Sequence, residues 1–272
     1  MKPVEMSHVL KLTRFELLVH RRKIMGWSLC VFVIMFIYMI LFSSIQEIAQ
    51  VKMDAMPKEL LQLVGMSDMS DMSHYITYFG MIFNLVLIAV SLFATTFSAG
   101  LIVKDEQTKS IEFLASLSVS RTEIYVSKLL TAFVGVLMVI SMAAISALIC
   151  GLIGGGETFV MMDFITIVKF SSVTPFFFIA IAFLCAGAFV KISPVMVSSG
   201  VVILTYVAGY LGVLLEDKAK WLLHLSPFEL FSPTHALALE RSTLIAFSSY
   251  VIIAIIAGVV GHYVYKRRDF VV

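Results

Sequence analysis

Six long runs without a charged residue constrain the fold of this chain more than any other feature of its sequence. The whole chain is 60% hydrophobic and only 14% charged, which excludes a soluble globular domain, where about 25% of residues carry charge. A bilayer core of about 30 Å needs about 20 apolar residues in helical form, so each run is long enough to cross a membrane. The runs are Ile24–Gln46, Met72–Val103, Leu129–Gly156, Phe170–Val190, Ile192–Leu215 and Ser242–Tyr265.

The runs are continuously apolar, whereas the strands of a membrane barrel alternate apolar and polar residues, so helices are favoured over strands. We therefore predict an all-α polytopic membrane protein with a single transmembrane domain over residues 1–272. The predicted spans cover approximately residues 25–45, 76–103, 129–153, 170–190, 194–215 and 244–265.

The distribution of basic residues predicts the orientation of these spans. With the N-terminus inside, the cytoplasmic side receives fourteen of the 20 Lys and Arg residues, and the opposite side receives six. Cytoplasmic loops retain positive charge, so this orientation is the favoured one. Both termini are expected to be cytoplasmic, beside the basic clusters Arg21-Arg22-Lys23 and Lys266-Arg267-Arg268.

Residues 1–23 precede the first span and carry an apolar stripe. Leu12, Phe15 and Val19 recur at the spacing of one helix face, which predicts an amphipathic interfacial helix lying in the membrane plane. The alternative is a helix that simply extends the first span into the cytoplasm.

Residues 216–243 form the predicted outer loop before the sixth span. This loop is partly apolar and contains Pro227 and Pro233. Apolar content together with helix breakers predicts short re-entrant or interfacial helices, which are tolerated where protein buries them or where they line water.

The first outer loop contains a small Met-Ser-Asp repeat followed by a histidine. Thioether and imidazole groups can bind a soft metal such as Cu(I), because soft ligands select it. No thiolate supports such a site, so these residues are weak candidates only and no metal centre is assigned; the alternative is an ordinary loop leading into the second span. The candidates are Met66, Met69, Met72 and His74.

Residues 104–128 form the largest predicted cytoplasmic loop. Ile111, Leu114 and Leu117 recur at helical spacing, which predicts a short amphipathic helix across the membrane face. A second helix is expected from about Arg121 and continues as the third span. The short helix could act as a lever if a partner grips it, or it could be an ordinary solvated connection.

Two absences narrow the function. A phosphate-binding P-loop needs a Gly-Lys pair, and none occurs in this sequence. Ion-coupled transporters usually carry ionisable groups near the membrane midplane, and the middle of every apolar run lacks them. The chain is therefore not expected to bind ATP by a P-loop or to couple transport to an ion.

Within the loop of residues 104–128, the stretch from Glu106 to Lys128 resembles the cytoplasmic signature of type-2 ATP-binding-cassette (ABC) transporter permeases. Two positions depart from the usual pattern, since Lys109 stands where Gly is common and Ser118 where Pro is common. The resemblance extends over the chain through its six spans and internal termini. The matching residues are Glu106, Ser110, Ile111, Glu112, Leu114, Val119, Ser120, Arg121 and Lys128.

The resemblance implies a role for residues 110–117 as a coupling helix that docks on a separate ATPase subunit. The expected coupling residues are Glu106, Ser110, Ile111, Glu112, Phe113, Leu114, Leu117 and Arg121, with the apolar members gripping and the charged members setting register. The resemblance further implies two ATPase chains, which bind ATP and Mg²⁺, and a second permease chain. The chain itself is expected to carry no cofactor and no catalytic site.

Three functional hypotheses stay open at this stage. The first is the permease subunit of an ATP-driven exporter, in the lipid bilayer of a bacterial cell membrane and without a nucleic-acid partner. The second is a membrane scaffold or sensor whose cytoplasmic loop recruits a partner without transport. The third is a copper-handling permease that uses the Met-rich outer loop.

Overall fold

The computed structural model of the chain describes residues 5–42, 44, 74–107, 119–189, 192–215, 218–238 and 241–267. These residues form helices, and no strand occurs among them. In chain order the elements are α1 (Met6–Ile40), α4 (Tyr75–Gln107), α6 (Arg121–Gly154), η2 (Gly156–Thr158), α7 (Met161–Ser171), α8 (Val173–Ala188), α9 (Pro194–Leu214), η4 (Lys220–Leu225), α10 (Pro227–Leu230), α11 (Pro233–Ala238) and α12 (Arg241–Arg267).

The expected all-α polytopic fold is confirmed. Six helical stretches within the described residues are long and apolar enough to cross a membrane. They are Met6–Ile40, Tyr75–Val103, Arg121–Gly154, Met161–Ala188, Pro194–Leu214 and Leu244–Arg267.

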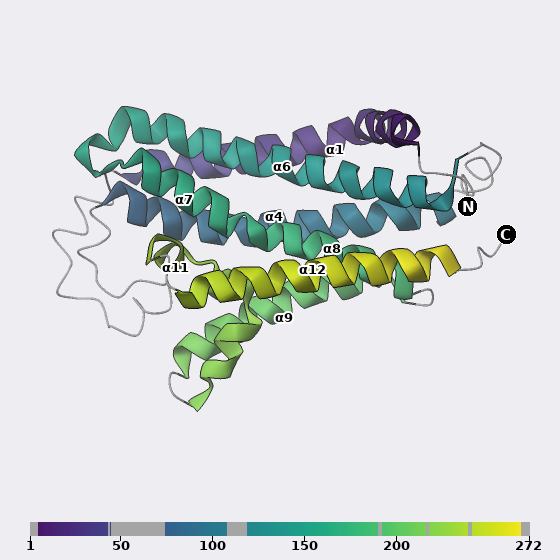
Figure 1. The fold of residues 1–272 in the computed structure, drawn as a ribbon. Helices are drawn as coiled ribbons and strands as arrows, with labels where there is room; N and C mark the ends of the chain where they lie inside the picture. The colour runs from purple at the N-terminus through teal and green to yellow at the C-terminus, as the bar shows by residue number, and fades with distance from the viewer. Residues whose placement is uncertain are drawn as a thin grey trace.

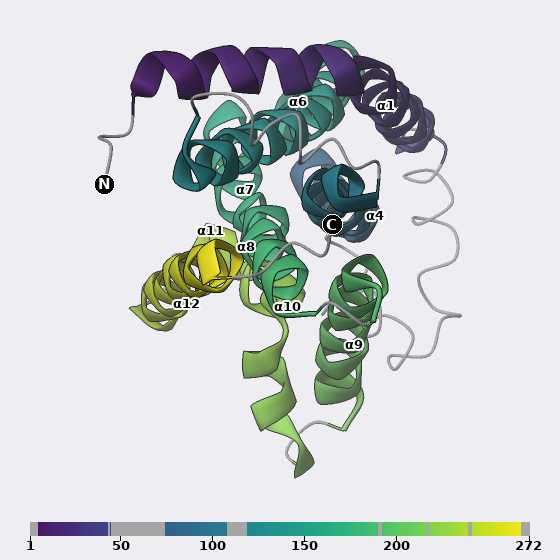
Figure 2. The same ribbon diagram turned by 90° about the vertical axis from the view of Figure 1, so that its right-hand side faces the viewer.

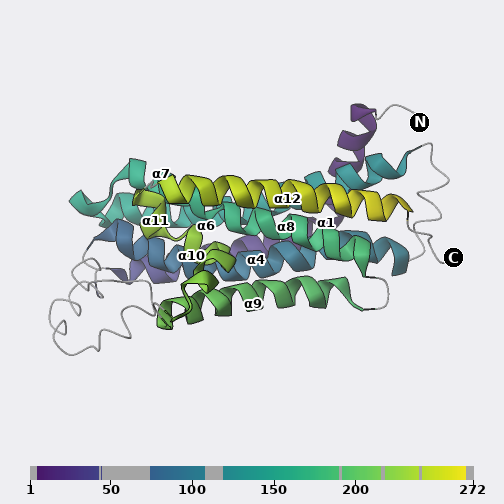
Figure 3. The same ribbon diagram turned by 60° about the horizontal axis from the view of Figure 1, so that its bottom comes forward.

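The long helices run side by side, as Figure 1 shows. At one end, on the right of Figure 1, α1, α6 and α9 begin and α4, α8 and α12 end; we call this end the base. α1 bends, so that its first part lies across the ends of its neighbours and its remainder runs along the bundle (Figures 2 and 3). A helix that lies in the membrane plane would cross the bundle in the way that the first part of α1 does. The contact of this part of α1 with a bilayer stays a prediction.

α4 and α8 lie at the centre of the bundle. In the most apolar stretch of α4, 67% of residues are buried, against 17% in α12. Aromatic rings along α4 fill the core, with Phe79, Phe83 and Phe93 fully buried. A helix with an apolar exposed face is stable in lipid, because the hydrocarbon solvates that face. The outer faces of α1, α9 and α12 are therefore suited to lipid contact.

The fourth span differs from the predicted interval 170–190. Its helix starts at Met161 and contains Asp163 and Lys169, both of which lie ahead of the predicted interval. Most of the residues from Met161 to Ser171 are apolar, and this stretch forms the helix α7. A break follows at Ser172, because Pro175 lacks an N–H and its ring conflicts with the carbonyl four residues earlier.

In the segment of η4, α10 and α11, the helices α10 and α11 pack into the end of the bundle opposite the base, and η4 lies against the end of α9. Phe228 and Phe231 are each only 1% exposed. The Ser171 hydroxyl donates to the carbonyl of Phe231 at 2.8 Å, and the Thr174 hydroxyl donates to the carbonyl of Pro227 at 3.3 Å. The break between α7 and α8 is thus bonded to this segment, whose depth in a membrane stays a prediction.

Candidate functional site

Most of the predicted coupling residues lie outside the described residues: Ser110, Ile111, Glu112, Phe113, Leu114 and Leu117. The structure does describe the two helices that flank them. Glu106 lies in the last turn of α4, and Arg121 is the first residue of α6, so the helix expected from about Arg121 does begin there. Both helix ends lie at the base (Figure 1).

Of the candidate metal ligands, Met66, Met69 and Met72 fall outside the described residues. His74 is an exposed residue directly before α4, at the end of the bundle opposite the base. Within the described residues, no three His, Cys, Asp or Glu side chains form a group that could hold a metal ion. The site described below is therefore the polar cluster at the base.

The start of α6 is closed by a capping box. The Ser120 hydroxyl accepts a hydrogen bond from the backbone N–H of Glu123 at 3.2 Å, and the Glu123 carboxylate accepts one from the backbone N–H of Ser120 at 2.6 Å. The sequence Ser-Arg-Thr-Glu from Ser120 to Glu123 has the spacing of this motif. α6 consequently has a firmly defined first turn immediately after the predicted coupling segment.

The same carboxylate ties α6 to the first turn of α1. Glu123 is only 3% exposed, and its second oxygen accepts a hydrogen bond from the backbone N–H of Glu5 at 2.8 Å. His8 places its Nδ1 3.8 Å from that oxygen. One turn further along α6, the Thr13 hydroxyl reaches the carbonyl of Ser127 at 3.3 Å. The crossing part of α1 is therefore bonded to the start of α6.

The other face of the start of α6 is bonded to the last turns of α12. The Arg121 guanidinium donates to the carbonyl of Lys266 at 3.1 Å, and the Tyr125 hydroxyl donates to the carbonyl of Gly258 at 2.9 Å. Thr122 Oγ1 and His262 Nε2 lie 3.2 Å apart. The last carbonyls of a helix have no partner within that helix, so the arginine satisfies one of them.

Lys128 connects α6 to α4 and α1 from within the bundle. Its side chain is 2% exposed, and its ammonium donates to the carbonyl of Leu101 in α4. The Glu16 carboxylate of α1 lies 3.5 Å from the same nitrogen, and Glu16 also lies 3.4 Å from His20 Nδ1. Lysine is almost never fully buried unless it is paired, so these partners account for its position.

The signature in the sequence includes Ser120, Arg121 and Lys128 of this cluster, and it indicates none of their partners in α1 and α12. It also gives no sign that Lys128 is a buried junction between three helices, as it is in the structure. The detectable signal was Glu16 with His20 one helical turn later, an acid and a base on one face of an otherwise basic and apolar helix. Tyr125 and His262 give no such signal, because their partners lie far away in the chain.

The cluster is suited to a mechanical role. The first two turns of α6 are hydrogen-bonded to α1 and α12. Lys128 of α6 is hydrogen-bonded to α4, the helix that precedes the predicted coupling segment in the chain. Groups that are buried and mutually bonded move together, because separating them would leave polar atoms without partners. A displacement imposed between Gln107 and Arg121 would therefore reach four helices.

Comparison with known proteins agrees with the resemblance seen in the loop. Residues 13–266 match the family model described as the C-terminal domain of the multidrug efflux system permease Rv1217c. The matched interval contains the polar cluster at the base from Thr13 to Lys266, and at least part of every helix from α1 to α12. No curated protein matches the sequence.

Proposed function

The chain belongs to the family of the multidrug efflux permease Rv1217c, and from this premise we propose that it is the membrane subunit of an ATP-driven exporter. The coarser statement is established: the protein is a multi-pass membrane permease. The efflux activity named for the family supports outward transport as the direction. The chain forms the substrate pathway, and the energy comes from a separate ATPase subunit.

Residues 110–117 are the proposed docking element for the ATPase. The observation that supports this proposal is a hydrogen bond between α4 and α6, the two helices that flank the segment. The segment leaves α4 six residues after Leu101 and enters α6 seven residues before Lys128, and Lys128 donates to Leu101. A force on the segment thus acts on two helices that are already joined, and through Glu16 and Glu123 it acts on α1.

The proposed assembly has two ATPase chains and two permease chains in a bacterial cell membrane. The ATPase chains bind ATP and Mg²⁺, and this chain carries no cofactor and no catalytic site. The base faces the cytoplasm with both termini, because α12 ends there with Lys266 and Arg267 and positive charge is retained on that side.

The test replaces Ile111 and Leu114 together by Asp in the full chain, co-expressed with its ATPase. The apolar grip is lost, so we expect the ATPase to co-purify poorly and substrate-stimulated ATP hydrolysis to fall at least about tenfold, which corresponds to roughly 1.4 kcal/mol. Membrane insertion stays normal, as measured by the yield of folded protein. The permease purified alone hydrolyses no ATP.

Val160→Asp is the matched control. Val160 is exposed, lies at the end opposite the base and precedes the first residue of α7, where Asp is a favourable cap. Co-purification and hydrolysis are expected to equal those of the native protein. Normal co-purification and transport by the Ile111 and Leu114 variant would contradict the proposal. Partner binding without any transport by the native complex would instead indicate a scaffold or sensor.

A further inference from the structure

α12 is hydrogen-bonded to other elements towards both of its ends. In its second half, the carbonyl of Gly258 accepts the hydroxyl hydrogen bond of Tyr125 in α6. Towards its start, the Tyr250 hydroxyl donates to the carbonyl of His224 in η4 at 3.1 Å. Figures 1 and 3 show α12 running from the base to the opposite end of the bundle, where η4, α10 and α11 lie. We call these three elements the distal segment.

The Tyr250 side chain is packed into the distal segment. It is only 8% exposed, and its ring lies edge-on to that of Phe231 at the end of α10, with the centroids 5.5 Å apart. Phe247, one turn earlier in α12, also meets Phe231, at 6.3 Å. His224 lies near the end of η4, where carbonyl groups have no partner within the helix, so the tyrosine hydroxyl satisfies one of them. Tyr250 therefore holds α12 to both η4 and α10.

The stretch of α12 between these contacts is short and unbroken. Tyr250 and Gly258 are about two helical turns apart, roughly 12 Å along the axis. α12 is a single helix from Arg241 to Arg267 and contains no proline, the residue at which helices most often kink. A displacement of Gly258 along the helix axis is therefore passed on to Tyr250.

α12 can shift without disrupting the core of the bundle. In its most apolar stretch only 17% of residues are buried, against 61% in the stretch formed by α7 and α8. Lipid adapts to a small displacement of the exposed faces, whereas a close-packed core does not. Where α12 meets α8, a Cβ added at Gly187 would lie 3.0 Å from the carbonyl oxygen of Gly261. Two glycines interlock no side chains at this contact, which favours sliding of one helix along the other.

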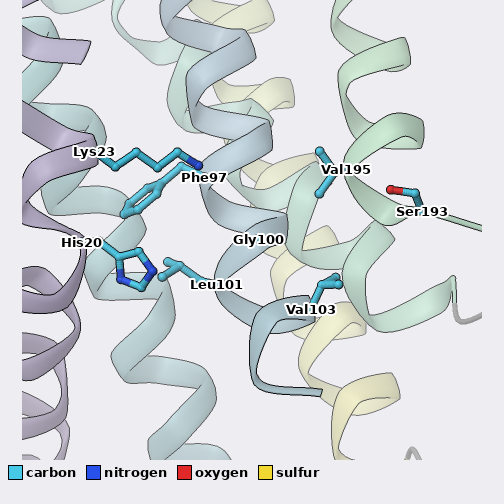
Figure 4. Close-up of a pocket in the computed structure, with 8 residues that line it drawn as sticks. All are labelled: His20, Lys23, Phe97, Gly100, Leu101, Val103, Ser193 and Val195. Carbon is cyan, nitrogen blue, oxygen red and sulfur yellow. The ribbon is translucent and has the colours of Figure 1, made fainter. Parts of the chain in front are cut away.

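α9 also reaches the distal segment, and it is held differently at the base. An open cavity of about 300 Å³ lies there between α1, α4 and α9 (Figure 4). Its lining includes Ser193 and Val195 at the start of α9, and His20 and Lys23 of α1. The hydrogen bonds and ion pairs described above for the base join α6 to α1, α4 and α12, and none of them involves α9. A displacement of the start of α6 thus reaches the distal segment more directly through α12 than through α9.

We propose that α12 carries a displacement of the start of α6 to the distal segment, with Tyr125 and Tyr250 as the positioning residues at its two contacts. The use of this link in transport rests on the proposed function, because the ATPase is what would displace α6. The link itself is a property of the permease alone. Replacement of either tyrosine by phenylalanine removes one hydroxyl and keeps the ring, so each contact can be interrupted with little change in packing.

The first test uses the full permease alone in lipid nanodiscs and follows amide hydrogen exchange in residues 226–232. Tyr125→Phe removes the bond at the base, so exchange in this distal range should rise at least about twofold, the scale of one contact in a coupled network. Tyr78→Phe is the matched control, since its hydroxyl donates to the carbonyl of Tyr38 at 2.8 Å and joins α4 to α1 without involving α12. The control should leave exchange in 226–232 unchanged. Equal exchange in the native protein and Tyr125→Phe, or an equal rise in the control, would overturn the proposal.

The second test adds the ATPase and compares exchange in residues 226–232 with ATP and vanadate against exchange without nucleotide. The native complex should show a difference, and Tyr250→Phe should reduce it about fivefold, which corresponds to about 1 kcal/mol for one neutral hydrogen bond. ATP hydrolysis should persist in Tyr250→Phe, because this residue contacts the distal segment and not the base. The double variant with Tyr125→Phe should respond like Tyr250→Phe, since both changes interrupt one connection.

Three outcomes of the second test would contradict the role of α12: no difference in the native complex, an undiminished difference in Tyr250→Phe, or losses that multiply in the double variant. Failure of the ATPase to bind the native permease would instead contradict the proposed function. The first test would then still decide whether α12 links the base to the distal segment, because it needs no ATPase.

Discussion

Replacing Lys128 by Met tests whether the base is held together by its buried ion pair. Lys128 and Glu16 have side-chain exposures of 2% and 15%, and their charged atoms lie 3.5 Å apart. Met has a similar length and no charge, so the variant removes the ammonium and leaves the packing nearly unchanged. The Leu101 carbonyl then loses this donor, and Glu16 keeps only His20 of its two basic partners.

The expected loss of stability follows from these contacts. Removing one partner of a buried pair typically costs about 3–5 kcal/mol, because the other charge is left uncompensated. Glu16 is not fully buried and retains His20 at 3.4 Å, so the lower end, about 3 kcal/mol, applies. At about 2–4 °C per kcal/mol for a domain of roughly this size, the Tm should fall by about 6–12 °C.

Thermal unfolding in detergent with a thiol-reactive fluorophore measures this loss. Cys185 is buried in α8 and becomes reactive when the bundle opens. Glu16→Gln in the Lys128→Met background removes the uncompensated charge, so the double variant should recover about 1–2 kcal/mol relative to the sum of the single changes. Lys169→Met is the control, since Lys169 is exposed on α7, and its Tm should stay within about 1 °C of the native value.

A Tm of Lys128→Met equal to that of the control would refute the reasoning. Full additivity of the two single changes would show that Glu16 and Lys128 do not interact, and the junction between α1, α4 and α6 would then depend on apolar packing alone.

Two further predictions concern the segment that packs against α9 at the end opposite the base. Gly209→Ala should destabilise by about 1–3 kcal/mol, because its Cβ would lie 2.7 Å from Ser226 Cβ and 2.8 Å from Glu229 Cγ; Gly200→Ala, which meets no atom within 4 Å, should not lower the Tm of the same assay. Burial raises the pKa of the Glu229 carboxyl above its ordinary value, so the folded protein binds more protons than the unfolded chain and stability falls as pH rises from the ordinary to the raised pKa. Glu229→Gln should therefore remove part of the Tm gain seen on acidification from about pH 7 to about pH 5, and an undiminished gain would contradict this assignment.

The sequence predicts the membrane fold well because the hydrocarbon imposes a local requirement. A span must be apolar over about 20 consecutive residues, and such runs are visible without knowledge of any contact. The same criterion is weaker where charges sit beside a span. Asp163 and Lys169 precede the fourth charge-free run, and the helix nonetheless begins ahead of both at Met161, because helical hydrogen bonding continues through charged residues.

The candidate site was predictable in part, through the motif that ends in Arg121 and Lys128. The roles of Glu16, Glu123 and Tyr125 were not, since each contacts residues more than a hundred positions away. Such pairs depend on how α1, α6 and α12 pack. The Ser-x-x-Glu capping box is an exception, because both of its partners lie within one turn.

By itself the sequence determined that this chain has six helical spans and which loop resembles a coupling element, and its basic residues predict the orientation of the spans. The tertiary structure decided that Lys128 is a buried junction, that α1 and α12 hold the start of α6, and that a cavity opens between Lys23 and the start of α9. The physical reason is the separation along the chain between the residues that interact. Hydrophobic span length and capping act between neighbours in the chain, whereas burial, ion pairing and cavities arise only after distant helices have packed.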